Sequence, residues 1–374
     1  MDLITLAQQI INGLSLGSLY ALIAIGYSMV YGLLRLINFA HGDLLMVSAY
    51  VAVMGLGLFA WPWPVAVGAA VAVTGLMGVL LELGAYRPLR RAPRISLLIS
   101  AIAASFFLES LVLLIAGGIP RPFPQPSWLV ASWRLGDLYL PRLSLVIPSV
   151  TALLLGALFF LVYHTQTGRA MRALAFDLET AALMGIRVNR LIAFTFLVGS
   201  LLAGCGGILW SLKHPNLDPY MGVLPGLKAF IAAVLGGIGN LFGAVLGGLV
   251  LGMVEIMLVA LFPAWSGYRN FLAFGLLIFI LLVRPTGLLG EALGKQQRAH
   301  RLTEELATHQ RELKRRLADS RPVPVYIGAV SQRGFHGITS TDADYFPLEV
   351  GGAVNLAKKL GKDGHLHIDK EQLL

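Results

Sequence analysis

The sequence predicts an all-α fold: a polytopic membrane helix bundle of about eight spans, with one broken or re-entrant segment and a polar C-terminal tail. Hydrophobic residues make up 56% of the 374 residues, charged residues only 13%, and the mean hydropathy is +0.74, which is far above the range of soluble proteins. Charge is also unevenly placed. The first 290 residues hold 16 Lys and Arg and 9 Asp and Glu, whereas the last 84 hold 13 and 11. We therefore expect a transmembrane domain (1–290), an amphipathic helical linker (291–320) and a small α/β or partly disordered tail (321–374).

Apolar runs of about 20 residues predict the individual spans. These runs are 8–34, 43–60, 65–85, 95–117, 144–163, 190–211, 239–262 and 270–284. Residues 226–238 are too short to cross a bilayer unaided. They predict a broken or re-entrant helix, which is tolerated at membrane depth only where protein or water satisfies its backbone.

Arginine-rich loops predict the orientation. Residues 86–94 and 164–190 carry four arginines each, and such loops stay on the cytoplasmic side. The N-terminus would then lie outside and the tail inside, although residues 118–143, with three arginines, also fall outside. These loops account for most of the basic surplus in the membrane domain, so we expect no nucleic-acid partner. Cys205 is the only cysteine, which gives no thiolate cluster, and we expect neither a cofactor nor a metal.

The stretch "INFAHGD" (37–43) gathers polar residues between two apolar runs. A metal site, a catalytic dyad and a polar turn between helices are the alternatives, but a metal needs further ligands and catalysis needs a nucleophile or cofactor. Asn38 and His41 are three apart, which predicts one helical face at the end of the first span, and Asp43 would open the next helix. They either only close the turn or also form part of a cytoplasmic gate.

Small residues mark two further segments. Gly13 and Gly17, continued by Tyr20 and Tyr27, form either a packing stripe or a face that lines a pathway. A second glycine ladder surrounds the short apolar segment and makes Gly236, Gly237 and Asn240 candidates for a translocation or gate role. No strand precedes these glycines, which argues against a phosphate-binding loop.

Intramembrane charges are costly unless they are paired or hydrated. Glu109 and Glu255 are therefore translocation candidates, whereas Glu82, close to the arginine loop, is interpreted as an interface residue. Lys213 and Lys228 flank the broken segment, where they either partner a carboxylate or, as we expect, extend to the interface as long amphipathic side chains do.

The most informative polar stretch is "GRAMRALAFDLETAALMGIRVNR" (168–190). An apolar stripe predicts a short helix that begins after Gly168, and Gly185 followed by Ile186 predicts its C-terminal cap. The helix is either an ordinary connector or a docking element for a soluble partner.

Four stretches together resemble the LivH-type permease subunits of branched-chain amino-acid ABC importers. They are "NGLSLGSLYALIAIGYSMVYG" with "INFAHGD", "GRAMRALAFDLETAALMGI", "GLKAFIAAVLGGIGNLFGAVLGG" and "RPTGLLG", and they cover about residues 5 to 290 in order. The resemblance implies that the cytoplasmic stretch is the coupling helix that fits the ATPase. The residues that would take this role are Arg172, Asp177, Ala181, Gly185 and Ile186.

The resemblance also implies the partners: two ABC ATPase subunits, a second permease in a heterodimer or a homodimer, a solute-binding protein, and the lipid of a bacterial inner membrane. The chain itself should not hydrolyse ATP, since Gly290, Gly294 and Lys295 depart from a P-loop in spacing and lack a following Ser or Thr. Branched-chain amino acids are the implied cargo. Urea or a short amide is the alternative, and an ion-coupled secondary transporter with broken helices is the competing class.

The tail is not covered by the resemblance. Within it, 325–330 predicts a strand and 353–360 a short helix. His365 and His367 lack further ligands at metal-binding spacing and are interpreted as surface residues.

Overall fold

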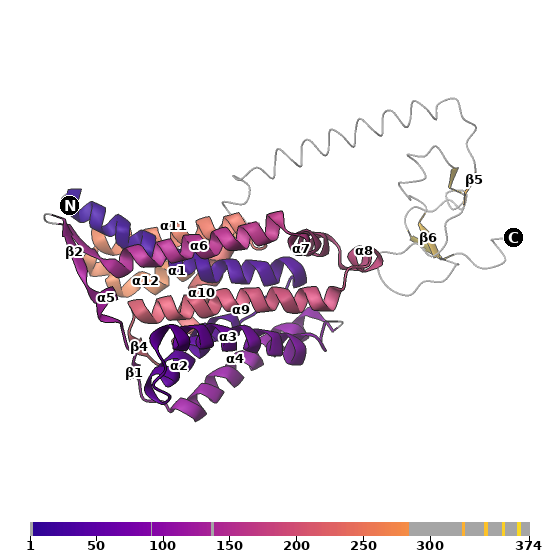
Figure 1. The fold of residues 1–374 in the computed structure, drawn as a ribbon. Helices are drawn as coiled ribbons and strands as arrows, with labels where there is room; N and C mark the ends of the chain where they lie inside the picture. Colours follow the sequence, from indigo (N-terminus) through magenta and orange to yellow (C-terminus); the bar gives the residue numbers. More distant parts are fainter. Residues whose placement is uncertain are drawn as a thin grey trace. The chain divides into compact units, whose positions relative to one another are not determined.

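The computed structural model describes residues 3–283, apart from 91, 136 and 137, and four short strands nearer the C-terminus. The chain divides into two units, Met1–Leu293 and Gly294–Leu374. The first unit is a helix bundle (Figure 1). The predicted linker 291–320 and the "RPTGLLG" stretch lie outside the described residues, so the proposed domain boundaries stay predictions.

The bundle contains helices at every predicted position. The long ones are α1 (Leu3–Leu34), α3 (Trp63–Leu81, extended by a π-helical turn, Glu82–Tyr86), α4 (Arg94–Ala116), α6 (Arg142–His164), α9 (Val188–Lys213) and α11 (Leu241–Leu261). Six spans in the described chain, built on these helices, are long and apolar enough to cross a membrane. The other two predicted spans are shorter: α2 (His41–Gly57) has 17 residues and α12 (Arg269–Val283) has 15. Six of the predicted spans are therefore candidate membrane spans by length and composition, and the total of about eight stays a prediction.

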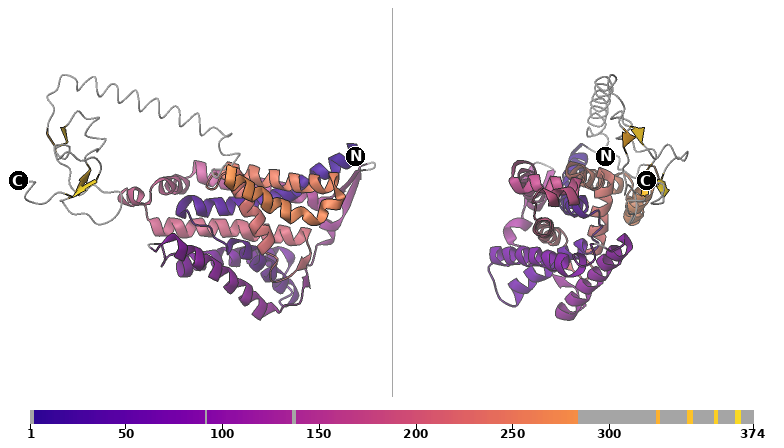
Figure 2. Two further views of the ribbon diagram at one scale, coloured as in Figure 1. Left: turned by 180° about the vertical axis from the view of Figure 1, so that it is seen from behind. Right: turned by 90° about the vertical axis from the view of Figure 1, so that its right-hand side faces the viewer.

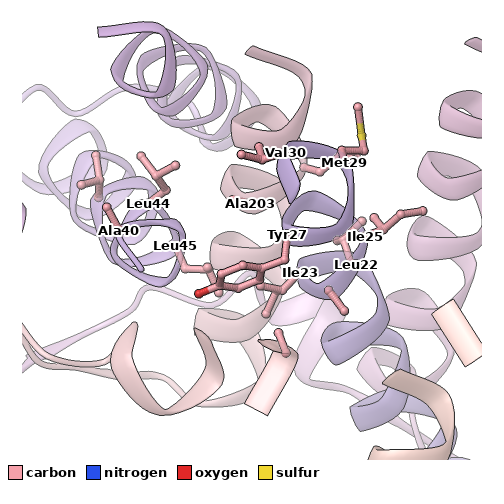
Figure 3. Packing of buried hydrophobic residues seen from close by; sticks show 14 of the residues in the cluster. Leu22, Ile23, Ile25, Tyr27, Met29, Val30, Ala40, Leu44, Leu45 and Ala203 are labelled. Atoms are coloured by element: carbon pink, nitrogen blue, oxygen red, sulfur yellow. The ribbon is translucent and has the colours of Figure 1, made fainter. Parts of the chain in front are cut away.

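Two spans form the centre of the bundle. In the most apolar stretch of each span, 78% of the residues of α1 and 67% of those of α9 are buried within the chain. The corresponding share is 28–33% for α3, α4, α6 and α11. Figure 2 shows the bundle from behind and from the right-hand side of Figure 1. Figure 3 shows part of the core, with the ring of Tyr27 reaching from α1 toward Leu44 and Leu45 of α2 and toward Ala40, which directly precedes α2. The surrounding helices keep apolar faces exposed, as a lipid or subunit interface requires.

The two ends of the bundle differ. The end that holds the N-terminus also holds short elements of the 117–141 loop (Figure 1). These are β1 (Arg121–Pro122), α5 (Ser127–Val130), β2 (Ser132–Leu135) and β3 (Leu138–Pro141), with β1 pairing with β4 (Asn216–Leu217) and β2 with β3. The all-α prediction missed these strands. At the opposite end lie α7 (Gln166–Phe176) and α8 (Leu178–Leu183).

In the second unit the described elements pair as two small ladders. β5 (Pro324–Val325) is parallel to β7 (Val354–Asn355), and β6 (Ser340–Asp342) is antiparallel to β8 (His365–His367). The predicted helix at 353–360 is therefore wrong at Val354 and Asn355, which are extended and paired. The predicted strand at 325–330 is confirmed only at Val325.

Candidate functional site

Two short helices begin inside the bundle and meet there. They are α2 and α10 (Val223–Gly236), the latter being the segment predicted to be broken or re-entrant. A Cβ on Gly42 would lie 2.7 Å from the carbonyl oxygen of Gly222, and a Cβ on Gly226 would lie 2.8 Å from Cα of Gly42. Only glycine allows two backbones to approach this closely. We call this meeting point the junction.

The junction lies well inside the end of α1. A Cβ on Gly26 would be 2.5 Å from Nε2 of His41, the first residue of α2, and the rings of Tyr27 and His41 pack edge to face at 4.6 Å. Gly26 precedes the last residue of α1 by eight residues, about 12 Å along the helix. The chain therefore leaves α1 at Leu34, folds back through residues 35–40, and starts α2 beside Gly26, about two turns inside the end of α1.

A cavity of about 160 Å³ opens beside the junction. We call it the junction pocket. Its polar lining comes from Tyr27 of α1, Asp43 of α2, and Ser105 and Glu109 of α4, and its apolar lining includes Phe39, Ile102 and Leu227. The Ser105 hydroxyl donates a hydrogen bond to Asp43 Oδ2. Asp43 lies in the first turn of α2, as predicted, but it is 1% exposed and contacts a third helix.

The predicted shared face of Asn38 and His41 is wrong. Asn38 lies in the loop before α2, where its Oδ1 accepts a hydrogen bond from the Tyr86 hydroxyl at 2.6 Å. His41 is buried at the start of the helix. The two residues are linked through the backbone, with the His41 N–H donating to the Asn38 carbonyl at 3.1 Å. Their three-residue spacing therefore belongs to a turn, because α1 ends four residues before Asn38.

A buried ion cluster lies on another side of the bundle. Glu255 of α11 accepts hydrogen bonds from Lys228 Nζ at 2.7 Å and from the Tyr20 hydroxyl at 2.9 Å, and Arg269 Nε lies 3.4 Å away. The side chains of Lys228 and Glu255 are only 8% and 5% exposed. Lys228 therefore partners a carboxylate, as one alternative predicts, and its expected interface position is wrong, because an ion pair lowers the free-energy cost of burying its charge. Glu82 is likewise fully buried, under an ion pair with Arg90.

The remaining predicted residues pack helices together. A Cβ on Gly17 would lie 2.8 Å from the backbone of Leu249, and one on Gly13 would lie 2.7 Å from Met253 Sδ. Both therefore belong to a tight seam between α1 and α11, as the packing alternative predicts. Gly236, Gly237 and Asn240 form the turn from α10 to α11, and Asn240 precedes the first residue of α11.

At the opposite end from the N-terminus, α7 and α8 form a bent helical element. The prediction of one helix starting after Gly168 is wrong. Helix α7 already begins at Gln166, and the helical conformation is interrupted at Asp177, after which α8 begins. Asp177 caps α8: its carboxylate accepts hydrogen bonds from the Thr180 N–H at 3.2 Å and the Thr180 hydroxyl at 2.6 Å. Such an N-cap stabilises a helix start.

The predicted C-terminal cap is confirmed. Gly185 has φ +82°, its N–H donates to Ala182, and the Ile186 N–H donates to Ala181. This is the Schellman pattern that glycine favours. Ala181 itself is buried against the bundle, so its side chain faces inward.

Arg172 holds the element to the bundle. Its Nη1 donates to the Val162 carbonyl at the end of α6, and its guanidinium lies over the Tyr163 ring at 5.2 Å. The outer surface of the element carries three exposed apolar side chains among polar ones: Phe176, Leu183 and Met184 are 90%, 87% and 78% exposed. The sequence analysis assigned nothing to these three side chains.

Sequence reasoning also missed Ser105, Gly222 and Gly226 at the junction. A signal was present for each. Ser105 and Glu109 are four apart on one apolar helix, and Gly222 and Gly226 form a small-xxx-small pair just before the short segment.

A bundle of apolar helices in which two short helices begin inside the bundle, with a helical element that exposes apolar side chains at one end, is typical of a polytopic membrane transport protein. The chain belongs to the family described as branched-chain amino acid transport system / permease component, whose model matches residues 9–281.

The similar proteins agree with this family. The high-affinity branched-chain amino acid transport system permease protein LivH of Escherichia coli (strain K12) is 42% identical over 296 residues, covering 76% of this chain and 95% of that protein. The corresponding protein BraD of Pseudomonas aeruginosa is 41% identical over 294 residues with the same coverage. Among solved structures, PsaBC from Streptococcus pneumoniae in complex with Fab has a TM-score of 0.40 at 12% identity, covering 76% of this chain and 94% of that chain.

Proposed function

We propose that this chain is the permease subunit of an ABC importer that carries branched-chain amino acids across a bacterial inner membrane. The observation that carries the proposal is the 42% identity to LivH over 95% of that protein. Two ABC ATPase subunits would supply the energy, a second, different permease would complete the translocation pathway, and a solute-binding protein would deliver cargo to the outer face. The chain needs no ATPase motif of its own in this arrangement.

The direct test is ATP-driven uptake. The chain is reconstituted in proteoliposomes with the ATPases, second permease and binding protein encoded beside it, and labelled leucine, isoleucine and valine are offered. ATP-dependent accumulation of these amino acids is the expected result. Uptake of urea or short amides instead would show that the cargo is not a branched-chain amino acid. Uptake by this chain alone under a proton or sodium gradient would show that it is a secondary transporter and not an ABC permease.

The bundle supports an orientation with the N-terminus outside. The two basic loops lie at the same end, because Arg90 Nη1 donates to Asn189 Oδ1 at 2.8 Å, and Asn189 lies in the first turn of α9, which follows the α7–α8 element. An end that carries both loops is the one expected to face the cytoplasm. The α7–α8 element would then meet the ATPase there, and the tail that follows α12 would share that side.

Asp177 offers a test of coupling that separates its cap from its charge. Asp177→Lys removes the cap and reverses the charge, and is expected to abolish ATP-driven uptake. Asp177→Ala loses the cap, worth about 1 kcal/mol of helix stability, and is expected to reduce uptake several-fold. Asp177→Asn keeps a capping side chain and is expected to retain most of the activity. Normal uptake by Asp177→Lys would show that this element does not couple to the ATPase.

Phe176 tests the apolar outer surface of the element. Phe176→Ala is expected to weaken co-purification of the ATPase subunits at least fivefold, because a side chain that is 90% exposed gains its burial only from a partner. Its thermal stability should match that of the wild type. Phe160→Ala, on the exposed face of α6, is the matched control and should retain the ATPase. Equal retention by both variants would remove Phe176 from the interface.

A further inference from the structure

The junction pocket contains a carboxylate whose position calls for a cationic ligand. Glu109 is only 9% exposed and lines the pocket, and it has no hydrogen-bond or ion-pair partner among the residues that the structure describes. A carboxylate within an apolar helix is costly unless it is paired or hydrated. The other two intramembrane glutamates, Glu82 and Glu255, are both ion-paired. Glu109 therefore differs from them in facing a cavity.

A second carboxylate faces the same space. Asp43 lines the pocket from α2, and Ser105, one turn before Glu109 on α4, donates to its Oδ2. This bond holds the carboxylate in one orientation. The polar groups around the cavity are therefore two carboxylates and the hydroxyls of Ser105 and Tyr27. No Lys, Arg or His lines the pocket within the described chain. The polar lining thus complements a positive group.

The rest of the pocket suits a short amphiphile. Phe39, Ile102 and Leu227 provide apolar walls, which complement a branched alkyl chain. The pocket is also bounded by the first turns of α2 and α10, and the N-terminal ends of helices carry partial positive charge that favours an anion. A zwitterion with a branched alkyl side chain matches all three features.

We propose that the junction pocket is a cargo subsite in which Asp43 and Glu109 bind the ammonium group of a branched-chain amino acid. This inference rests on the proposed function and extends it to a place and to the chemistry of recognition. A partly dehydrated ammonium group donates up to three hydrogen bonds, and carboxylate acceptors strengthen each of them. The alkyl side chain then contacts the apolar walls.

The test is equilibrium binding of labelled leucine to the full permease complex in nanodiscs, without the solute-binding protein. Glu109→Gln and Asp43→Asn are expected to raise the Kd for leucine at least about tenfold, the loss that one charge-assisted hydrogen bond produces. Asp218→Asn, which changes a carboxylate in the loop before α10 that is absent from the pocket lining, is the matched control and should stay within twofold.

Competition separates the two ends of the cargo. 3-Methylbutylamine has the alkyl chain and the ammonium group, whereas 3-methylbutanoate has the alkyl chain and the carboxylate. The amine is expected to displace leucine from the wild type and to lose this ability in Glu109→Gln. Stronger displacement by the acid would overturn the proposal. Displacement by sodium ions in place of choline, lost in the same variant, would overturn it in favour of an inorganic cation.

Failure of this inference can be told from failure of the proposed function. Wild-type complexes that accumulate leucine with ATP, but whose leucine Kd is unchanged by both Glu109→Gln and Asp43→Asn, would overturn the subsite alone. Complexes that accumulate no branched-chain amino acid would overturn the function. Absence of leucine binding in the wild type, with uptake intact, would also reject the subsite.

Discussion

Replacing Glu255 by leucine is expected to destabilise the bundle by about 3–5 kcal/mol, the range for removing one partner of a buried ion pair. The change leaves the Lys228 ammonium group without its carboxylate in a position where its side chain is 8% exposed, and it also removes the acceptor of the Tyr20 hydroxyl. The free energy of unfolding of the purified chain, measured by denaturant titration in detergent, checks the size of the effect.

Replacing the other partner, Lys228, by methionine is expected to lower the free energy of unfolding less than Glu255→Leu does. In Lys228→Met the carboxylate keeps its hydrogen bond from Tyr20 and remains near Arg269, whose Nε lies 3.4 Å from Oε1. The double variant Glu255→Leu with Lys228→Met should be more stable than Glu255→Leu alone, because no unpaired ammonium group is left. Strict additivity of the two single changes would contradict a direct interaction.

Gly252→Val is expected to lower the free energy of unfolding by at least about 3 kcal/mol, or to prevent folding, because the added side chain would collide with backbone atoms. A Cβ at this position would lie 2.2 Å from the backbone nitrogen of Gly17. No side-chain rotation relieves that contact, so α1 and α11 would have to separate along the seam. Expression level and thermal unfolding in detergent are the measurements.

The matched control is Gly156→Val on α6. It also places a β-branched side chain within a long apolar helix, but a Cβ at Gly156 would meet nothing within 4 Å. It should therefore unfold close to the wild-type temperature. Equal losses in both variants would mean that β-branching in a helix, and not the seam, sets the cost.

The sequence could predict what depends on local pattern. Apolar runs located the helices, and Gly185 with Ile186 marked a helix end because the cap uses residues within six positions. Pairing over long separations could not be read in this way. Lys228 and Glu255 are 27 residues apart, and Asp43 and Ser105 are 62 apart, so only the packing of three or four helices decides that they meet.

The start of α2 shows a second limit of local patterns. Residues 35–40 have the composition of a turn between two helices, and the sequence contains no sign that the next helix begins beside Gly26 and not at the bundle end. That position follows from glycine contacts with Gly222 and Gly226 at the start of α10, about 180 residues further along the chain.

The ion cluster has a mechanical consequence for the junction pocket. Val223 and Gly226 form one wall, and Lys228, half a turn further along the same helix, is fastened to Glu255 and through it to the seam between α1 and α11. That wall is fixed. Helix α4 forms another wall. Only 28% of its most apolar stretch is buried, and the hydrogen bond from Ser105 to Asp43 joins it to α2. If α4 moved outward and widened the pocket, the hydrogen bond from Ser105 to Asp43 would break and Glu109 would move away from Asp43.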